Sequence, residues 1–293
     1  MATIRSLGVL LCYNDADILE DALLHLLNNN HDLVIWDHGS DDGTAQVLDR
    51  YGPWLAERKF IPRSFDFYQL YQHMSQHLIT SYIRQYDWIS WPDQDELLEG
   101  PDRTKSYAAW VATVFEQGYD YVQFNNFNFW LTTEDDPGIL SPVERVRHYG
   151  LFPDCAPRIR AWRAEVTNIR LFNHNDLTGQ KLPFHFNLRH YPMRTEEQMI
   201  RRINKDRAGL QRGNSNFHYN NMANMAAGSD ANRATGPEHN KASDLARLMI
   251  PPGRLHFDNG ISELDPTVKY NWRDIYGYGP VEGSSDNPAG GPS

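Results

Sequence analysis

Two aspartates spaced two residues apart, Asp93 and Asp95, follow a short apolar run at residues 88–92. The run has the composition of a buried strand, and carboxylates at positions i and i+2 after a strand can converge on one hard cation. Oxygen ligands of this kind suit Mg²⁺ or Mn²⁺, which keep coordination positions open for substrate phosphates. Ligands of open α/β sheets also bind at the carboxyl ends of strands. Together these features predict an enzyme that acts on a nucleoside diphosphate conjugate.

The elements that would hold these carboxylates begin upstream. Residues 7–12 are apolar throughout, as expected for a strand covered on both faces. Residues 18–27 carry apolar side chains at helical spacing, and Asn14 or Asp15 is the expected cap of that helix. Residues 33–36 form a second apolar strand. A strand, a helix and a strand within about 30 residues make a βαβ unit.

The rest of the first two thirds of the chain continues this alternation. Further helices are predicted at residues 45–51, 68–85, 107–117 and 195–208, and further strands at residues 60–61, 121–129 and 158–162. We therefore predict an α/β fold with a mixed, mostly parallel sheet flanked by helices. Its start is Rossmann-like, and its C-terminal extension consists of helices and loops.

The composition limits the class of protein. The chain has 293 residues, a net charge of −10 and a pI near 5.6, so it lacks the basic surface of a nucleic-acid-binding protein. No apolar run reaches the roughly 18–20 residues that span a bilayer, and the first residues lack a signal-peptide core. We therefore expect a cytoplasmic protein without a membrane span. The two cysteines, Cys12 and Cys155, form no metal-binding cluster and are not expected to pair in a reducing compartment.

Composition also divides the chain. Residues 213–241 are rich in Asn, Gly, Ala and Ser, which is typical of a long functional or mobile loop. Residues 279–293 are rich in Gly, Pro and Ser. We predict a catalytic domain over residues 1–210, an extension over residues 211–278 that could act as a lid and acceptor region, and a disordered tail over residues 279–293.

Three segments resemble the family 2 glycosyltransferases, which have the GT-A fold. Residues 10–16 look like the family's opening strand, with Asp15 in place of the usual Glu. Residues 34–44 are similar to its Asp-Asn-Gly-Ser-x-Asp-Gly-Thr turn, and residues 87–96 are similar to its DxD strand. Residues 189–195 resemble, more weakly, a His-Tyr-x-x-Arg-Ser stretch in one branch of such enzymes. The resemblance fades beyond residue 210.

The resemblance implies a site for a nucleoside-diphosphate sugar and a divalent cation, Mn²⁺ or Mg²⁺. Asp95 would bind the cation directly, and Asp93 would hold the ribose or a cation-bound water. His190 would be a further metal ligand, with His185 as the alternative. The implied donor-binding residues are Tyr13, Asn14, Asp37, Gly39, Asp93, Arg189 and Arg194, and the implied metal-binding residues are Asp93, Asp95 and His190.

Two of these assignments have a physical basis in residue type. The carboxylate of Asp37, at the end of a strand, can accept hydrogen bonds from a nucleobase or a ribose; the alternative is a helix-capping or turn aspartate. Arg189 and Arg194 could neutralise a diphosphate, or each could form an ordinary ion pair. Asp42, by contrast, precedes a helix and is expected to bond its free N–H groups.

The reaction implied is transfer of a sugar from a UDP- or GDP-linked donor to a hydroxyl of a saccharide or small-molecule acceptor, with inversion. A carboxylate would take the proton of that hydroxyl. Asp154 is the predicted base, with Asp176 and residues 134–136 as alternatives, and Glu96 would orient neighbours or help to position the acceptor.

Two other functions remain open. A nucleotidyltransferase of similar fold would begin with a glycine-rich loop carrying a basic residue, which residues 12–15 lack. A non-catalytic carbohydrate-binding protein would have no need of a metal-binding DxD.

Overall fold

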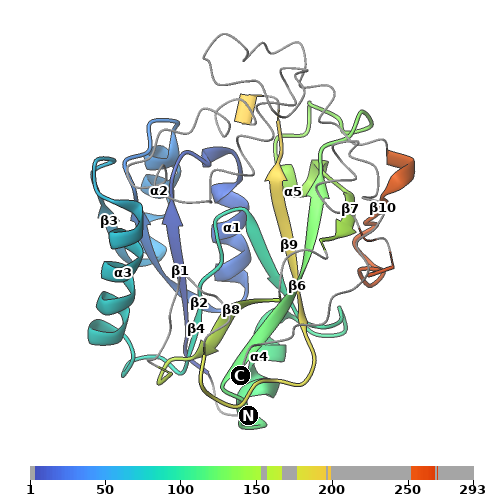
Figure 1. Ribbon diagram of the computed structural model, residues 1–293. Helices are drawn as coiled ribbons and strands as arrows, with labels where there is room; N and C mark the ends of the chain where they lie inside the picture. The colour runs from blue at the N-terminus through green and yellow to red at the C-terminus, as the bar shows by residue number, and fades with distance from the viewer. Residues whose placement is uncertain are drawn as a thin grey trace, which may run out of the picture.

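The computed structural model describes residues 4–152, 157–166, 177–195, 197–198, 252–267 and 269. Figure 1 shows a central twisted sheet with helices packed against it. The strands are β1 (Ser6–Cys12), β2 (His31–Asp37), β3 (Leu55–Phe60), β4 (Trp88–Ser90), β5 (Glu96–Glu99), β6 (Tyr121–Trp130), β7 (His148–Leu151), β8 (Arg158–Arg163), β9 (Phe186–Met193) and β10 (His256–Phe257). The helices are α1 (Ala16–Asn28), α2 (Thr44–Tyr51), α3 (Phe67–Ser81), α4 (Tyr107–Glu116) and α5 (Pro142–Arg145), with 3-10 turns η1 (Gly52–Trp54) and η6 (Pro252–Arg254).

The described strands form one mixed sheet in the order β10-β7-β6-β8-β4-β1-β2-β3, and β9 pairs with both β6 and β5. The strands β4, β1, β2 and β3 are neighbours and run parallel. Strand β8 is antiparallel to both β4 and β6. The carboxyl ends of β4, β1 and β2 therefore meet at one edge of the sheet.

Strand β1 shows why helices cover both faces of this sheet. Its seven residues are all buried, and alternate side chains enter different clusters. Leu10 and Cys12 pack with apolar residues of α1 and α2. Leu7, Val9 and Leu11 pack instead with residues of α3. Because successive side chains of a strand point to opposite faces, α3 covers one face and α1 with α2 covers the other.

The predicted α/β fold is confirmed, and most of the predicted elements lie within two residues of the observed ones. The expected strand at residues 60–61 is the end of a longer edge strand, β3, whose alternating polar side chains hid it. The antiparallel pairing of β5 with β9 was not predicted, because the two strands are far apart in the chain. The segments at residues 213–241 and 279–293, and most of the helix predicted at 195–208, lie outside the described residues.

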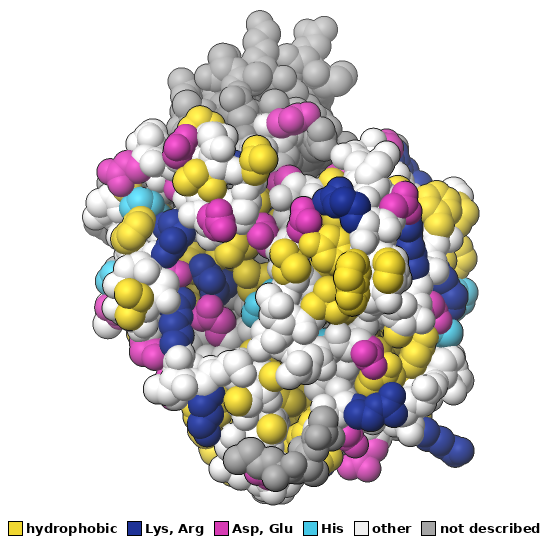
Figure 2. Space-filling model, turned by 180° about the vertical axis from the view of Figure 1, so that it is seen from behind, with side chains coloured by type: hydrophobic (Ala, Val, Ile, Leu, Met, Phe, Trp, Pro, Cys, Tyr) yellow, Lys and Arg dark blue, Asp and Glu magenta, His cyan; other side chains and the backbone are white. Residues whose placement is uncertain are grey.

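The surface carries mixed charge. On the face seen in Figure 2, Lys and Arg side chains are interspersed with Asp and Glu, and hydrophobic side chains lie between them. Among the described helices, none has the length and apolar character needed to cross a membrane. Cys12 is a buried free thiol in the core, as its apolar surroundings predicted.

Candidate functional site at the carboxyl edge of the parallel strands

The three turns after β1, β2 and β4 lie next to one another, because Cys12 at the end of β1 pairs with Asp37 at the end of β2. Asp37 is almost completely buried, and its Oδ1 accepts the backbone N–H of Ser40 at 3.0 Å. This bond closes the turn that follows β2. The structure therefore places the predicted donor-binding carboxylate beside the strand that leads to Tyr13 and Asn14.

The turns after β1 and β2 are bound to each other. The backbone N–H of Asn14 donates to Ser40 Oγ at 3.0 Å, and the Asn14 side-chain amide both donates to and accepts from Asp41 at 2.8 Å. Asp42 accepts the N–H of Ala16, the first residue of α1, at 2.9 Å. Asp15 is the N-cap residue of α1, as one of the two predicted candidates, but its side chain makes no capping bond and the capping carboxylate comes from Asp42 in the next turn.

Gly39 has a positive φ of 71°, and a Cβ there would lie 2.8 Å from the backbone nitrogen of Arg63. Arg63 donates to the Gly39 carbonyl at 3.1 Å, and its guanidinium carbon lies 5.4 Å from the centre of the Tyr13 ring. The close approach explains the glycine at this position. Gly39, Arg63 and the buried ring of Tyr13 consequently form one wall beside Asp37.

Asp93 is held by a cation from the neighbouring strand β8. Arg160 contacts the Asp93 carboxylate at 2.6 Å and the Glu96 carboxylate at 2.7 Å. Arg158 adds a second contact to Glu96 at 2.6 Å, and Glu96 in turn accepts the backbone N–H of Asp93 at 2.9 Å. Burial opposes ionisation of Glu96, but the charges of Arg160 and Arg158 outweigh it and hold the Glu96 pKa below its usual range. These contacts fit a Glu96 that orients Asp93, one of the two roles predicted for it.

Asp95 faces His190 across the antiparallel pair of strands β5 and β9. His190 Nε2 lies 3.6 Å from Asp95 Oδ2, and His190 Nδ1 lies 2.8 Å from the side-chain oxygen of Asn128. Because an amide oxygen only accepts, Nδ1 carries the hydrogen and Nε2 is directed at the carboxylate. A ring nitrogen fixed in this way is suited to bind a cation. The sequence expectation that Asp95 and His190 belong to one site agrees with this placement.

Arg194 lies against the same carboxylate from the other side but is completely buried. It contacts Asp15 at 2.6 Å, Asp17 at 2.7 Å and Asp95 at 3.7 Å. Gln94 donates to the second oxygen of Asp15. Three carboxylates therefore already surround the Arg194 guanidinium that was expected to neutralise a diphosphate, so its contacts are those of an internal counter-ion.

Arg189 is directed away from Asp95. It precedes His190 in β9, so the two side chains project to opposite faces of the sheet. Its guanidinium contacts Asp258 at 2.9 Å and Glu99 at 3.4 Å, and it stacks over the Phe129 ring at 4.6 Å. The structure does not bring this second predicted phosphate ligand to the carboxyl edge.

The predicted base Asp154 and its alternative Asp176 lie outside the described residues. His185, the alternative metal ligand, bonds Asn125 at 2.9 Å at the far end of β9 from His190. Arg158 and Arg160 were not singled out from the sequence. Their spacing of two on a strand, which mirrors the spacing of Asp93 and Asp95, was the available signal.

The carboxyl edge offers few protein ligands for a divalent cation. No group of three or more His, Cys, Asp or Glu side chains suited to a metal occurs in the part of the chain that the structure describes. Asp95 and His190 nevertheless offer one oxygen and one nitrogen at 3.6 Å. A cation that also binds diphosphate oxygens and water needs only a few protein ligands, and a carboxylate with an imidazole suits Mn²⁺. The residues present fit such a cation.

No protein-family model and no curated protein matches this chain. Among solved structures, S. aureus TarS is similar at a TM-score of 0.35 and 12% identity, over 75% of this chain and 42% of TarS. The chain thus spans less than half of that longer protein. A TarS fragment of residues 1–349 in complex with UDP is similar at a TM-score of 0.35 and 13% identity, over 75% of this chain and 69% of the fragment. Similarity of this degree determines neither a family nor a function.

Proposed function

We propose that the chain is a metal-dependent glycosyltransferase. It would transfer a sugar from a nucleoside-diphosphate sugar, UDP- or GDP-linked, to a hydroxyl of a saccharide or small-molecule acceptor, with inversion. One observation carries the proposal: Asp37 and the Asp93–Asp95 pair follow parallel strands that flank β1, at the edge where open α/β sheets bind ligands.

The nucleoside would lie over the turn after β2. Asp37 accepts one backbone bond within the turn, and its carboxylate can receive further hydrogen bonds from a ribose or base. The partly exposed Arg63 guanidinium, which lies over the buried Tyr13 ring, provides a flat surface next to that carboxylate. Such a surface can stack on a nucleobase.

The diphosphate would lie near Asp95 and His190. A divalent cation bound there would supply positive charge to the departing nucleoside diphosphate. The chain's own part is positional: Asn128 fixes the ring of His190, and Arg160 with Glu96 fixes Asp93. Asp154 stays the predicted base for the acceptor hydroxyl.

Two rival functions predict different behaviour. A nucleotidyltransferase would bind nucleoside triphosphate and release pyrophosphate, and the turn of Tyr13 and Asn14 offers no glycine-rich triphosphate loop for it. A non-catalytic carbohydrate-binding protein would bind sugar without nucleotide or cation. The Asp95–His190 pair favours the glycosyltransferase over the non-catalytic binding protein.

The first experiment is thermal unfolding with MnCl₂ and each of UDP, GDP, TDP, CDP and ADP, because binding to the native state raises the melting midpoint. We expect one nucleotide to raise the midpoint only when Mn²⁺ is present, and Asp95→Asn to remove that rise. Asp49→Asn, an exposed residue of α2, is the matched control and should keep the rise. The proposal fails if no nucleotide at millimolar concentration shifts the midpoint of the wild-type protein.

A further inference from the structure

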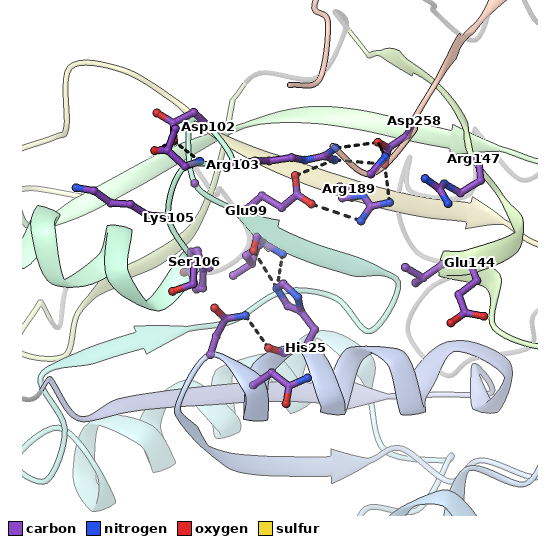
Figure 3. A pocket seen from close by; sticks show the side chains of 18 residues that line it. His25, Glu99, Asp102, Arg103, Lys105, Ser106, Glu144, Arg147, Arg189 and Asp258 are labelled. Carbon is purple, nitrogen blue, oxygen red and sulfur yellow. Dashed lines mark hydrogen bonds and ion pairs between the residues drawn. The ribbon is translucent and has the colours of Figure 1, made fainter. Parts of the chain in front are cut away.

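A cavity of about 720 Å³ lies on the other face of the paired strands β5 and β9 (Figure 3). The C-terminal half of α1, the segment after β5, the region around α5 and residues 258–260 surround it. Glu99 at the end of β5 lines it, and at about 3.3 Å per residue the Cα of Glu99 lies about 13 Å from that of Asp95. The cavity is therefore separate from the carboxyl edge.

Four charged side chains, of which Asp258 is buried and the other three are partly buried, form a closed ring in this cavity. Asp258 contacts Arg103 at 2.8 Å and Arg189 at 2.9 Å. Glu99 contacts the same two arginines at 3.4 Å. Figure 3 shows the carboxylates and guanidiniums alternating around this ring. Burial opposes the charge of Asp258, but its hydrogen bond to Arg103 and the nearby charge of Arg189 keep its pKa below the usual range.

The ring is neutral, and two cations of the cavity lie outside it. Lys105 and Arg147 lie to either side of the ring in the view of Figure 3. Lys105 Nζ lies 4.5 Å from the centre of the Trp110 ring. The Arg147 guanidinium carbon lies 5.6 Å from the centre of the Phe257 ring, and its Nε has no hydrogen-bond acceptor among the described residues.

Two lining carboxylates, Asp102 and Glu144, also lie outside the ring, so the acids and the cations that line the cavity are equal in number. Asp102 accepts two hydrogen bonds from Thr104, which hold it in its own turn. Glu144 points away from the ring toward the outside of the cavity in Figure 3. Arg147 therefore presents a positive charge beside a ring that is already neutral.

The one lining histidine adds no charge near neutral pH. His25 is buried, and its Nε2 lies 3.1 Å from the backbone nitrogen and 2.9 Å from the backbone oxygen of Leu98. Burial is the main cause that lowers its pKa to about 4. The positive charge of the cavity consequently comes from arginine and lysine alone.

We propose that this cavity is a second ligand site, which binds a small polar molecule through a carboxylate or phosphate group held by Arg147 beside the Glu99–Arg103–Asp258–Arg189 ring. The cavity volume lies within the range of small-molecule sites. An arginine with free edges is suited to either oxyanion. The site is independent of the nucleotide, because no residue of the carboxyl edge lines it.

The test is isothermal titration calorimetry at low ionic strength without divalent metal, so that the carboxyl edge does not contribute. The probes are inorganic phosphate, glucose 6-phosphate and glucuronate, with glucose as the uncharged control. We expect saturable binding of at least one anion and none of glucose. Binding of glucuronate alone would identify a carboxylate ligand, and binding of the phosphates alone a phosphate ligand.

Variants locate the binding. Arg147→Gln should weaken the anion about tenfold or more, since a hydrogen bond to a charged group is lost. Arg147→Lys should retain part of the affinity, and Arg50→Gln, an exposed arginine of α2, should bind like wild type. Each variant's circular dichroism and melting midpoint verify its fold. Failure of wild type to bind any of the three anions, or unchanged binding by Arg147→Gln, would overturn the proposal.

The two sites can fail separately. Arg147→Gln should keep the nucleotide response measured with Mn²⁺, and Asp95→Asn should keep the anion affinity. Loss of both responses in either variant would show that one site, and not two, had been measured.

Discussion

The carboxyl edge of the parallel strands and the cavity behind strands β5 and β9 differ in how their charges are paired. At the carboxyl edge the acids outnumber the cations that contact them, and the single Arg194 guanidinium contacts three aspartates. In the cavity two acids and two arginines form a neutral ring, and Arg147, whose Nε has no acceptor among the described residues, lies outside that ring. An edge with excess carboxylate favours a cation, and a guanidinium with an unpaired nitrogen favours an anion.

The same two strands separate these environments. His190 and Arg189 are consecutive in β9, and their side chains project to opposite faces, one to Asp95 and the other to Asp258. The alternation of a single strand is therefore sufficient to place two sites with different charge pairing on the two faces of the β5–β9 strand pair. Substitutions on either face of β9 test whether the two sites bind their ligands independently.

The largest effect is expected from Asp95→Asn. It removes the charge that pairs with His190, and transfer should fall at least a thousandfold, about 4 kcal/mol of transition-state stabilisation. Turnover of a radiolabelled nucleotide sugar measures this. The division between the sites would be wrong if the same variant also lost affinity for glucuronate or phosphate.

Arg194→Met tests whether the carboxyl edge needs its internal cation. The variant leaves Asp15, Asp17 and Asp95 facing one another without a guanidinium, and breaking a buried ion pair typically costs about 3–5 kcal/mol. Urea unfolding should show a loss of this size. Arg50→Met, which breaks an exposed pair with Glu20, is the control and should cost about 0–1 kcal/mol. Equal losses in the two variants would contradict a structural role for Arg194.

The dependence of stability on pH tests whether His25, which lines the cavity, and His31 are neutral in the folded protein. Burial lowers the pKa of His25 and of His31 from 6.5 to about 4, so both rings are neutral in the folded protein near pH 7. The unfolded chain binds these protons near pH 6.5, so the stability is fully present above that pH and is lost as the pH falls toward 4. Between pH 6.5 and 4.5 we expect a loss of about 1–3 kcal/mol for each histidine.

The measurement is urea unfolding at several pH values. His31→Gln should remove one histidine's share of the slope and leave the share of His25. Glucuronate affinity should stay constant from pH 7.5 to 6, because the cavity's cations do not titrate there. A tenfold rise in affinity over that interval would instead show that His25 carries the binding.

The smallest expected effect is a gain of anion affinity and not a loss of function. Asp258→Asn leaves Arg103 and Arg189 with only Glu99 as a charged partner, so the cavity becomes more positive. We expect anion affinity to tighten about three- to tenfold, with a loss of about 1–3 kcal/mol in stability. Added phosphate should restore part of that loss. Weaker anion binding by a folded Asp258→Asn would argue against a site governed by this ring.

The sequence predicted the elements whose signals are local. The apolar run of β1, the helical spacing of α1 and the turn after Asp37 are set by neighbouring residues, and each is observed. The pairing of Asp95 with His190 followed from a motif and agrees with the structure's geometry. These features depend on periodicity and turn chemistry that a short window contains.

The partners of the arginines could not be predicted in this way. For Arg189 and Arg194 the sequence left open a diphosphate or an ordinary ion pair; in the structure one contacts Asp258 and the other contacts Asp15 and Asp17. Such pairs depend on which face of β9 each side chain occupies, and β9 carries no clear alternating pattern. Its antiparallel pairing with β5 joins segments about 90 residues apart, a separation that local patterns do not encode.

The bond between Arg194 and Asp15 has a consequence for biosynthesis, because the two residues are 179 positions apart. The first βαβ unit leaves the ribosome with Asp15 and Asp17 unneutralised. At about 5–20 residues per second, Arg194 follows about 10–40 s later. The N-terminal unit thus cannot reach its final stability while it is being translated, and the docking of β9 completes it. Because closure of so long a loop is slow, we expect this ion pair to form in the last steps of folding and not in its nucleus.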